Sequence, residues 1–259
     1  MRKTKPLLVI LGECAELAEK LQRHFGPDAA VKSGHVITQE GSPLVVILTG
    51  KLSRETAECL KHYSSGDECP RMITLEPSPK MIFIETFPGL TVESVEGEED
   101  LLFILREMIC LHSLEGGCYH FQHEMPAEIG FLKRLKLFLF QAGKLLGLSG
   151  QQVFQSRLLM EEILINAMNY AYPNGKGKLG VDLRLSRNYF FLEVRDTGVG
   201  FNPDEIRDIS EWRQEDFYSI RGRGIFLVRS ISSELTILSR PGEGTLVRVK
   251  LVFPEKDAD

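Results

Sequence analysis

The spacing of apolar residues changes near residue 117, and this change constrains the fold more than any other feature of the chain. Before it, continuous apolar runs such as Leu7–Leu11 alternate with amphipathic helical segments. After it, long helical segments are followed by strands in which apolar and polar residues alternate. Continuous runs are typical of strands buried on both faces, and alternation of strands with one exposed face. We therefore expect two α/β domains of different architecture, residues 1–117 and 118–259.

The net charge divides at the same point. Residues 1–117 carry 12 Lys and Arg against 18 Asp and Glu, a net charge of −6, whereas residues 118–259 carry 19 against 18, a net charge of +1. The whole chain has a net charge of −5, which gives no general attraction to nucleic acid or to an anionic membrane. The two domains are expected to face different partners.

Cysteine usage and hydropathy indicate a cytoplasmic protein. The five cysteines are odd in number and contain no C-x-x-C pair, so we expect thiols rather than a disulfide framework. No apolar run is long enough for a membrane span, and the first one is too short for a signal peptide.

The pattern of the first domain predicts alternating strands and helices around a mostly parallel sheet. The predicted strands are Leu7–Leu11, Pro43–Leu48, Met72–Leu75 and Met81–Ile84, and the predicted helices are Glu13–Phe25, Ser53–Tyr63 and Glu98–His112.

The second domain begins with an edge strand, Tyr119–Glu124, after which Pro126 is expected to open a long helix that ends at Leu146. The remaining predicted elements are a helix over Gln151–Tyr172, a hairpin of Lys178–Ser186 and Tyr189–Asp196, a helix over Gly224–Ser233, and a hairpin of Glu234–Arg240 and Thr245–Phe253. A loop of about 25 residues precedes the third helix, and such a length is typical of a functional lid.

Two motifs in this domain carry oxygen ligands. Glu162 and Asn166 are four residues apart, so their side chains share one helix face. A carboxylate beside a carboxamide suits Mg²⁺ and general-base chemistry, although the pair alone is more often a solvated Glu and a surface Asn. Asp196 ends a strand and is followed by Gly198 and Gly200, which let the backbone come close to a ligand. The carboxylate can accept a hydrogen bond from an exocyclic amine, but alone this motif is equally a turn.

Two further glycine motifs follow. Arg221-Gly222-Arg223-Gly224 leads into the third helix, where free N–H groups and two guanidinium groups would suit phosphates. Gly242-Glu243-Gly244-Thr245 connects the last two strands and by itself reads as a turn.

In this order, the four motifs resemble the GHKL ATP-binding fold of histidine kinases, gyrase and Hsp90-type ATPases. Within that superfamily the chain is most similar to the anti-sigma-factor serine kinases, over residues 119–254. The segments that carry the resemblance are Met125–Ala127, Glu162–Tyr172, Asp196–Phe201, Arg221–Leu227 and Gly244-Thr245. The resemblance implies an α/β sandwich with a mixed sheet and an ATP lid.

The resemblance also implies roles for individual residues. Asn166 would bind the Mg²⁺ of the triphosphate, and Glu162 would be the catalytic base. Asp196 would bond the adenine amine, with Thr245 supporting it through water. The remaining contacts to the base and the phosphates would come from Gly198, Gly200, Arg221, Gly222, Arg223 and Gly224.

One position departs from the serine kinases, which usually carry His four residues after the metal-binding Asn. Tyr170 stands there in this chain, as in many histidine kinases. A histidine kinase, however, would need a dimerising helix pair that carries a phospho-accepting His. His123 precedes only one helix before the Asn-bearing helix, so we expect His120 and His123 to be ordinary strand residues.

The first domain loosely resembles a response-regulator receiver domain of the flavodoxin-like type. The receiver chemistry is absent, because Gly12-Glu13-Cys14, Leu48-Thr49-Gly50 and Glu85-Thr86 stand where paired acids, a phospho-accepting Asp and a Lys are expected. A degenerate receiver would serve docking, dimerisation or sensing; an unrelated α/β domain is the alternative.

These observations lead to a leading hypothesis and two rivals. The first is an ATP- and Mg²⁺-binding serine/threonine kinase that phosphorylates a regulator of the anti-anti-sigma type, binds a sigma factor, or does both, in a form that allows a homodimer. The second is a non-catalytic ATP-gated interaction module. The third is a simple ATPase.

Overall fold

The chain forms two units, Met1–His112 and Ser113–Asp259. The computed structural model describes residues 7–11, 15–34, 45–48, 71–75, 92–95, 98–112, 114, 117–173, 175–202 and 223–254. Within these ranges, no helix combines the length and the apolar character that crossing a bilayer requires.

The N-terminal unit is built on a five-stranded sheet. Its strands are β1 (Leu7–Leu11), β2 (Ala30–Gly34), β3 (Val45–Leu48), β4 (Arg71–Leu75) and β5 (Val92–Val95). They pair in the order β2-β1-β3-β4-β5, and every pairing is parallel. This order is one of the common arrangements of doubly wound α/β sheets. The predicted parallel sheet is confirmed.

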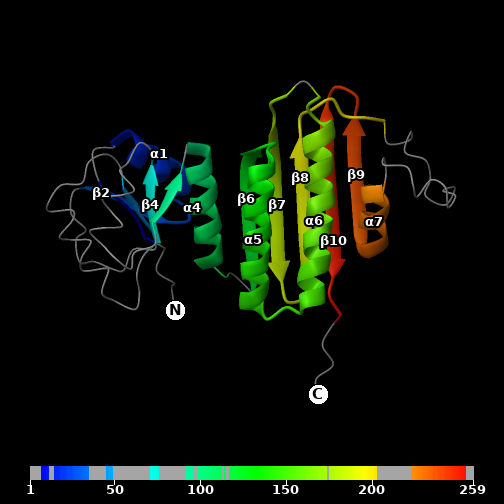
Figure 1. Ribbon diagram of the computed structural model, residues 1–259, viewed down its shortest axis with the longest axis horizontal. Helices are drawn as coiled ribbons and strands as arrows, with labels where there is room; N and C mark the ends of the chain where they lie inside the picture. Colours follow the sequence, from blue (N-terminus) through cyan, green and yellow to red (C-terminus); the bar gives the residue numbers. More distant parts are fainter. Residues whose placement is uncertain are drawn as a thin grey trace, which may run out of the picture. The chain divides into compact units, whose positions relative to one another are not determined.

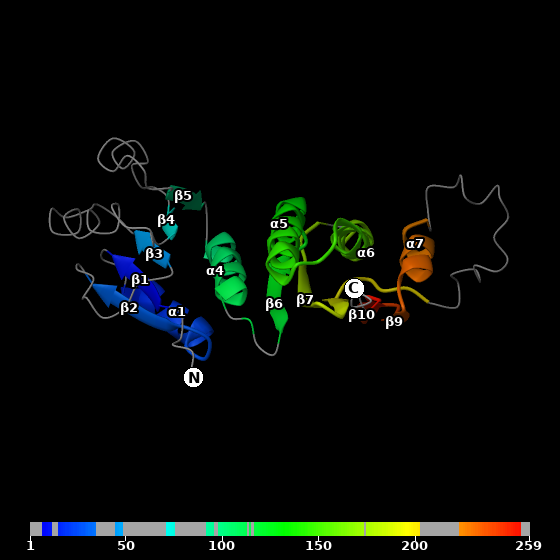
Figure 2. The same cartoon turned by 90° about the horizontal axis from the view of Figure 1, so that it is seen from below.

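Two helices, α1 (Ala15–Phe25) and α4 (Glu98–His112), lie on the same side of this sheet, as Figure 2 shows. The apolar residues of α1 recur every four positions, which places them on one face of the helix. They pack with α4 and with the central strands into a single cluster of buried residues. The largest fully buried side chains of the cluster are Phe25, Leu8, Ile10, Leu21 and Ile47.

Some predictions for this unit cannot be compared with the structure. The predicted helix Ser53–Tyr63 and the predicted strand Met81–Ile84 lie outside the described residues. Conversely, β2 and β5 were not predicted, and they are the two outer strands of the sheet. Both carry polar residues at their centres, so neither presents the continuous apolar run of β1.

The C-terminal unit also has five strands, but their arrangement differs. They are β6 (Cys118–Pro126), β7 (Lys178–Ser186), β8 (Tyr189–Asp196), β9 (Glu234–Arg240) and β10 (Gly244–Val252). The order is β6-β7-β8-β10-β9, and every pairing is antiparallel.

The mixed sheet implied by the family resemblance is therefore wrong for this unit. β8 and β9 do run in the same direction, but β10 lies between them and pairs with both. A parallel pairing never forms, because the last hairpin inserts its second strand into the sheet.

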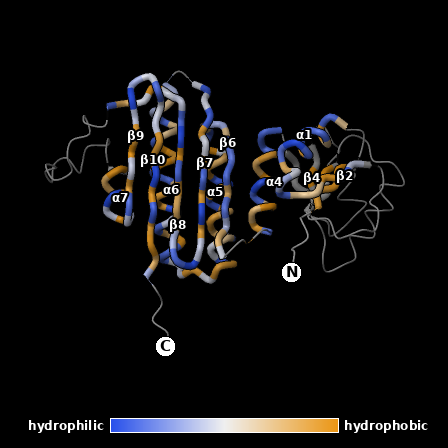
Figure 3. The backbone as a smooth tube through the Cα atoms, turned by 180° about the vertical axis from the view of Figure 1, so that it is seen from behind, coloured by the Kyte–Doolittle hydropathy of each residue, from blue (hydrophilic) through white to orange (hydrophobic). Residues whose placement is uncertain are grey.

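Three helices, α5 (Ile129–Leu146), α6 (Gly150–Tyr170) and α7 (Arg223–Ile231), cover one face of this sheet (Figures 1 and 2). Most strand side chains beneath them are apolar and buried. The opposite face carries charged residues together with the exposed Leu238 and Val252. Figure 3 shows how the hydropathy changes from residue to residue along the strands. On that face Glu193 accepts hydrogen bonds from Arg195 at 3.2 Å and from Arg248 at 2.9 Å.

The helix boundaries are set by local capping. Ser149 accepts a hydrogen bond from the Gln152 N–H while the Gln152 side chain accepts one from the Ser149 N–H, a capping box that starts α6. The expectation that Pro126 opens α5 is wrong. Pro126 is the last residue of β6 and faces Lys178 in the sheet, a position that an edge strand allows because its missing N–H faces away from the ladder.

Candidate functional site

The first part of the site is one face of α6. Glu162 and Asn166 lie one turn apart there, and both are half-buried. Gly224, in the first turn of α7, packs directly on them. A side chain at Gly224 would collide with a carboxylate oxygen of Glu162 and would approach the Asn166 amide nitrogen to 3.2 Å. The amino end of α7 is thus held beside a carboxylate and a carboxamide.

The electrostatics of this face favour a proton acceptor. Burial, with the neighbouring Glu161 carboxylate as the second cause, raises the pKa of Glu162. Glu161 itself is held by Lys136 at 2.5 Å, on the side of α6 toward α5. A carboxylate with a raised pKa is a stronger base, which is what a general base requires.

The second part of the site is the turn after β8. Asp196 is only 6% exposed, and its Oδ1 accepts a hydrogen bond from the Gly198 N–H at 2.9 Å. Burial raises the pKa of Asp196, although hydrogen bonds from the backbone of Gly198 and Thr245 act against that rise. A buried acid outside an ion pair costs stability, so its presence at a strand end favours a role in binding.

The turn is fastened to the end of α6. The Val199 N–H donates to the Ala171 carbonyl at 2.9 Å, and a side chain at Gly198 would collide with that same carbonyl. The Tyr172 hydroxyl accepts from the Thr197 N–H at 3.1 Å and donates to the Lys178 carbonyl at 2.6 Å. The two motifs, far apart in the sequence, are therefore one local structure.

The last hairpin completes this part of the site. Its tip reaches the same turn, because the Gly242 N–H donates to the Val199 carbonyl at 2.7 Å. Gly200 has a φ of +59°, and a side chain there would collide with the Arg240 carbonyl. Thr245 faces Asp196 across the β8–β10 pairing, so its side chain is on the same face of the sheet as the carboxylate.

Comparison with known proteins identifies the arrangement. Residues 125–251 match the family model described as the histidine kinase-like ATPase domain. The C-terminal unit contains a domain of this family. The match lies within the unit that holds the α6 face and the turn after β8.

The ATPase domain also has named relatives. Serine-protein kinase RsbW of Oceanobacillus iheyensis is 20% identical over 145 residues, which are 54% of this chain and 92% of that protein. Serine-protein kinase RsbW of Staphylococcus aureus is 22% identical over 124 residues, 46% of this chain and 78% of that protein. Anti-sigma F factor of Thermoanaerobacter sp. is 27% identical over 101 residues, 38% of this chain and 69% of that protein. The relatives therefore share the ATPase domain at low identity.

The structure places most of the predicted site residues in two groups. Glu162 and Asn166 meet Gly224, while Asp196 and Thr245 meet across two strands. The turn glycines join the second group. Arg221 and Gly222 lie outside the described residues, as does the side chain of Arg223.

Two residues that the sequence did not single out also lie in the candidate site. The Tyr172 hydroxyl accepts a hydrogen bond from the Thr197 N–H and donates one to the Lys178 carbonyl. The Ser239 hydroxyl accepts one from the Phe201 N–H. Ser239 could have been noticed, because the inward positions of β9 are Leu235, Ile237 and Ser239, and a polar residue breaks the apolar series. Tyr172 gave no such signal.

The two histidines of β6 lie in the strand, as predicted. His120 hydrogen-bonds to Asp182 on the outer face of the sheet, with its Nε2 3.1 Å from the carboxylate oxygen. Neither histidine stands on a helix, which is where a phospho-accepting His of the histidine kinase type would be expected.

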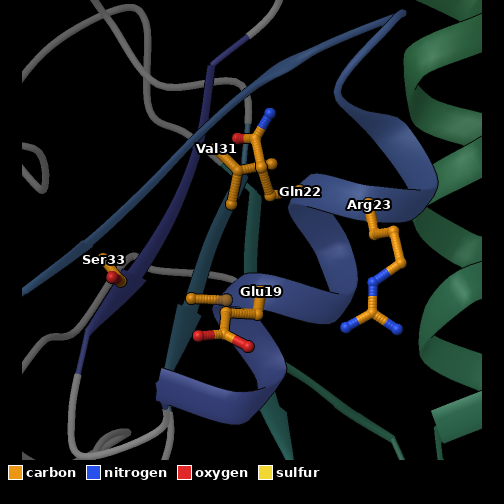
Figure 4. Close-up of a pocket in the computed structure, with 6 residues that line it drawn as sticks. Glu19, Gln22, Arg23, Val31 and Ser33 are labelled. Atoms are coloured by element: carbon orange, nitrogen blue, oxygen red, sulfur yellow. The ribbon is translucent and has the colours of Figure 1, made fainter.

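A hollow of about 530 Å³ lies in the N-terminal unit between α1 and β2 (Figure 4). Its lining consists of Ala18, Glu19, Gln22, Arg23, Val31 and Ser33. Every charged or amide-bearing residue of the lining comes from the exposed turns of one helix, so no set of polar groups converges on a ligand. We assign it no function.

Proposed function

We propose that the C-terminal unit binds ATP with Mg²⁺ and transfers the terminal phosphoryl group to a serine or threonine hydroxyl of a partner protein. The observation that carries the proposal is the packing of Gly224 against Glu162 and Asn166. It brings the amino end of a helix, a base and an oxygen ligand together, and phosphoryl transfer depends on such positioning and charge neutralisation.

The metal would be held mostly by the nucleotide. Among the described residues, no cluster of three His, Cys, Asp or Glu side chains could hold an ion alone. The Asn166 carboxamide oxygen suits Mg²⁺, which usually takes one or two protein oxygens together with phosphate oxygens. When bound, the ion would neutralise charge on the phosphates.

Glu162 would act as the general base. The partner's hydroxyl oxygen would form a bond to the γ-phosphorus, and its proton would pass to the Glu162 carboxylate. The bond from that phosphorus to the bridging oxygen would break, and ADP would leave with the electron pair. Burial raises the pKa of Glu162, which makes its carboxylate a stronger proton acceptor.

The adenine base of the nucleotide would lie at the turn after β8. Asp196 would accept a hydrogen bond from the adenine amine, and Thr245 would support it. Gly198 and Gly200 give the backbone the room that this turn needs. The phosphates would meet the residues at the start of α7, namely Arg221, Gly222, Arg223 and Gly224.

The partner is proposed from the names of the relatives. Serine-protein kinases and an anti-sigma F factor share the ATPase domain with this chain. We infer that the partner is a regulator of the anti-anti-sigma type, a sigma factor, or both, and that the chain can act as a homodimer. The N-terminal unit, with its parallel sheet in the order β2-β1-β3-β4-β5, is proposed to be a receiver-like docking or sensing domain.

Transfer of label from γ-labelled ATP tests the kinase proposal. The chain is incubated with purified candidate partners of the anti-anti-sigma type, as wild type, Glu162→Gln and Glu124→Gln. Removal of a general base is expected to reduce transfer by about 10²–10⁴-fold, with ADP binding unchanged. Glu124, an exposed residue of β6, is the matched control and should transfer at the wild-type rate.

Two results would count against this proposal. Wild-type transfer that survives Glu162→Gln would remove Glu162 from the reaction. Tight ADP binding without transfer to any candidate would favour the non-catalytic, ATP-gated module. In that case Asn166→Ala should abolish nucleotide-dependent partner binding while Glu162→Gln leaves it intact.

A further inference from the structure

Three polar residues form a row across the last three strands of the antiparallel sheet. Asp196 of β8 faces Thr245 of β10, and Thr245 faces Ser239 of β9. Directly opposed residues in antiparallel strands point to the same face, here the face covered by the helices. The next row on that face is entirely apolar: Val194, Val247 and Ile237. The polar row is therefore confined to the end of the sheet where the turn after β8 lies.

Ser239 is the most highly bonded member of the row. It is 9% exposed. Its hydroxyl oxygen accepts from the Phe201 N–H at 2.9 Å, lies 3.2 Å from the Gly244 carbonyl oxygen, and lies 2.9 Å from the Thr245 hydroxyl. A hydroxyl has one hydrogen and two lone pairs, so three partners use its full capacity.

The donors and acceptors follow from the partners. The Phe201 N–H can only donate, and the Gly244 carbonyl can only accept. The Ser239 proton therefore goes to Gly244, and Thr245 must donate its own proton to Ser239. With its proton used in this way, the Thr245 hydroxyl presents only lone pairs to anything else that approaches it.

Thr245 and the neighbouring Asp196 carboxylate both act as hydrogen-bond acceptors, and this determines which ligand edge they can pair with. The neighbouring acceptors match a ligand edge that carries an amine and oppose an edge that carries a carbonyl oxygen. Adenine presents an amine at position 6, whereas guanine presents an oxygen there. A site built to pair one group rejects an analogue that lacks it, because its own polar groups are left unpaired.

We propose that Ser239 is a specificity-determining residue: by holding Thr245 as an acceptor, it makes the site select a 6-amino purine over a 6-oxo purine. The proposal rests on the proposed function, because it concerns the base end of the same nucleotide site. Ser239 acts through Thr245 and is a positioning residue rather than a catalytic one.

The chain offers a matched control for a merely structural role. Ser186, in the β7–β8 hairpin, is 8% exposed. Its hydroxyl accepts from the Asn188 and Tyr189 N–H groups and lies 3.3 Å from the Tyr189 carbonyl oxygen. Both serines are thus buried to a similar degree and bonded to backbone groups, and of the two only Ser239 is bonded to Thr245.

Isothermal titration with ADP and with GDP, on the full chain, tests the proposal. The wild type is expected to bind ADP more tightly than GDP. Ser239→Ala should reduce that preference by about tenfold, the effect of one hydrogen bond of ordinary strength. Ser239→Thr, which keeps the hydroxyl, should restore the preference, and Ser186→Ala should leave it unchanged.

The outcomes separate this inference from the proposed function. A wild type that binds neither nucleotide would overturn both. A wild type that prefers ADP, with Ser239→Ala lowering both affinities equally or neither, would overturn the role of Ser239 alone. If Ser239→Ala fails to fold, Thr245→Val gives the same test, since it removes the acceptor with little change of shape. An unchanged preference in that variant overturns the proposal.

Discussion

The two sheets of the chain have the same number of strands and similar apolar cores, but their functional ends differ. In the parallel sheet, the edge at which ligands usually bind is formed by the strand ends Leu11, Leu48, Leu75 and Val95. In the antiparallel sheet, β8, β10 and β9 carry Asp196, Thr245 and Ser239 at the end of the sheet where the turn after β8 lies. The comparison teaches that the candidate site of the antiparallel sheet depends on a single row of polar side chains at one end of an otherwise apolar inner face.

The largest expected effect tests whether the two sheets are energetically separate. Ile47 is fully buried in the parallel sheet, so Ile47→Ala should destabilise the N-terminal unit by about 2–5 kcal/mol. Because the C-terminal unit has its own core, ADP affinity should not change. Denaturant unfolding and ADP titration of the same sample measure both quantities.

The matched variant for that experiment is Leu192→Ala, at an equally buried position in β8. It should destabilise the C-terminal unit, to which we assign nucleotide binding, rather than the N-terminal unit. If Ile47→Ala abolished ADP binding, the separation of the two sheets would be wrong.

The next effect concerns the polar row itself. Asp196→Ala should weaken ADP binding by about 10–100-fold, the range for a hydrogen bond to a charged group. Asp182→Ala serves as the control, because Asp182 is also a strand aspartate but lies on the outer face with Arg184 and His120. Equal losses for the two variants would show that the row is not the binding site.

Regular elements with strong periodicity could be predicted from the sequence. Helix Glu98–His112 and the hairpin strands Lys178–Ser186 and Tyr189–Asp196 have the predicted bounds. The missed strands, Ala30–Gly34 and Val92–Val95, are at the edges of the sheet. An edge strand has one neighbour and tolerates polar residues, so its local pattern is weak.

The features that depend on pairing could not be predicted. The position of β10 between β8 and β9 is set by how the last hairpin joins the sheet, which no local pattern records. The same applies to Ser239, whose neighbours Thr245 and Phe201 are known only once the register is known. By contrast, Glu162 and Asn166 could be singled out, because helix geometry alone puts residues four apart on one face.

The smallest expected effect concerns the pH dependence of transfer. Burial, and after it the Glu161 charge, raises the pKa of Glu162, so the basic form is lost as the pH falls through that raised pKa. Transfer should therefore decline on the acid side at a higher pH than for an ordinary glutamate. Glu161→Gln removes the like charge and should move this decline to lower pH, as a pH–rate profile would record.

Removal of Lys136, the cation that pairs with Glu161, should move the acid-side decline of transfer in the opposite direction. Lys136→Ala leaves the Glu161 carboxylate with only the more distant Arg157, at 3.8 Å, which strengthens the effect of Glu161 on Glu162 and should move the decline to higher pH. If neither variant moved the profile, the titrating group would not be Glu162, and the difference between the two sheets would rest on the polar row alone.

The contact between the tip of the last hairpin and the turn after β8 limits how the chain can change in length. The Gly242 N–H bonds to the Val199 carbonyl, and Gly200 has no room for a side chain beside Arg240. These contacts form only if the connection between β9 and β10 keeps its number of residues. An insertion between Arg240 and Gly244 would move the hairpin tip away from Val199 and expose the turn after β8. Descendants of this chain can therefore vary the composition of the hairpin tip more freely than its number of residues.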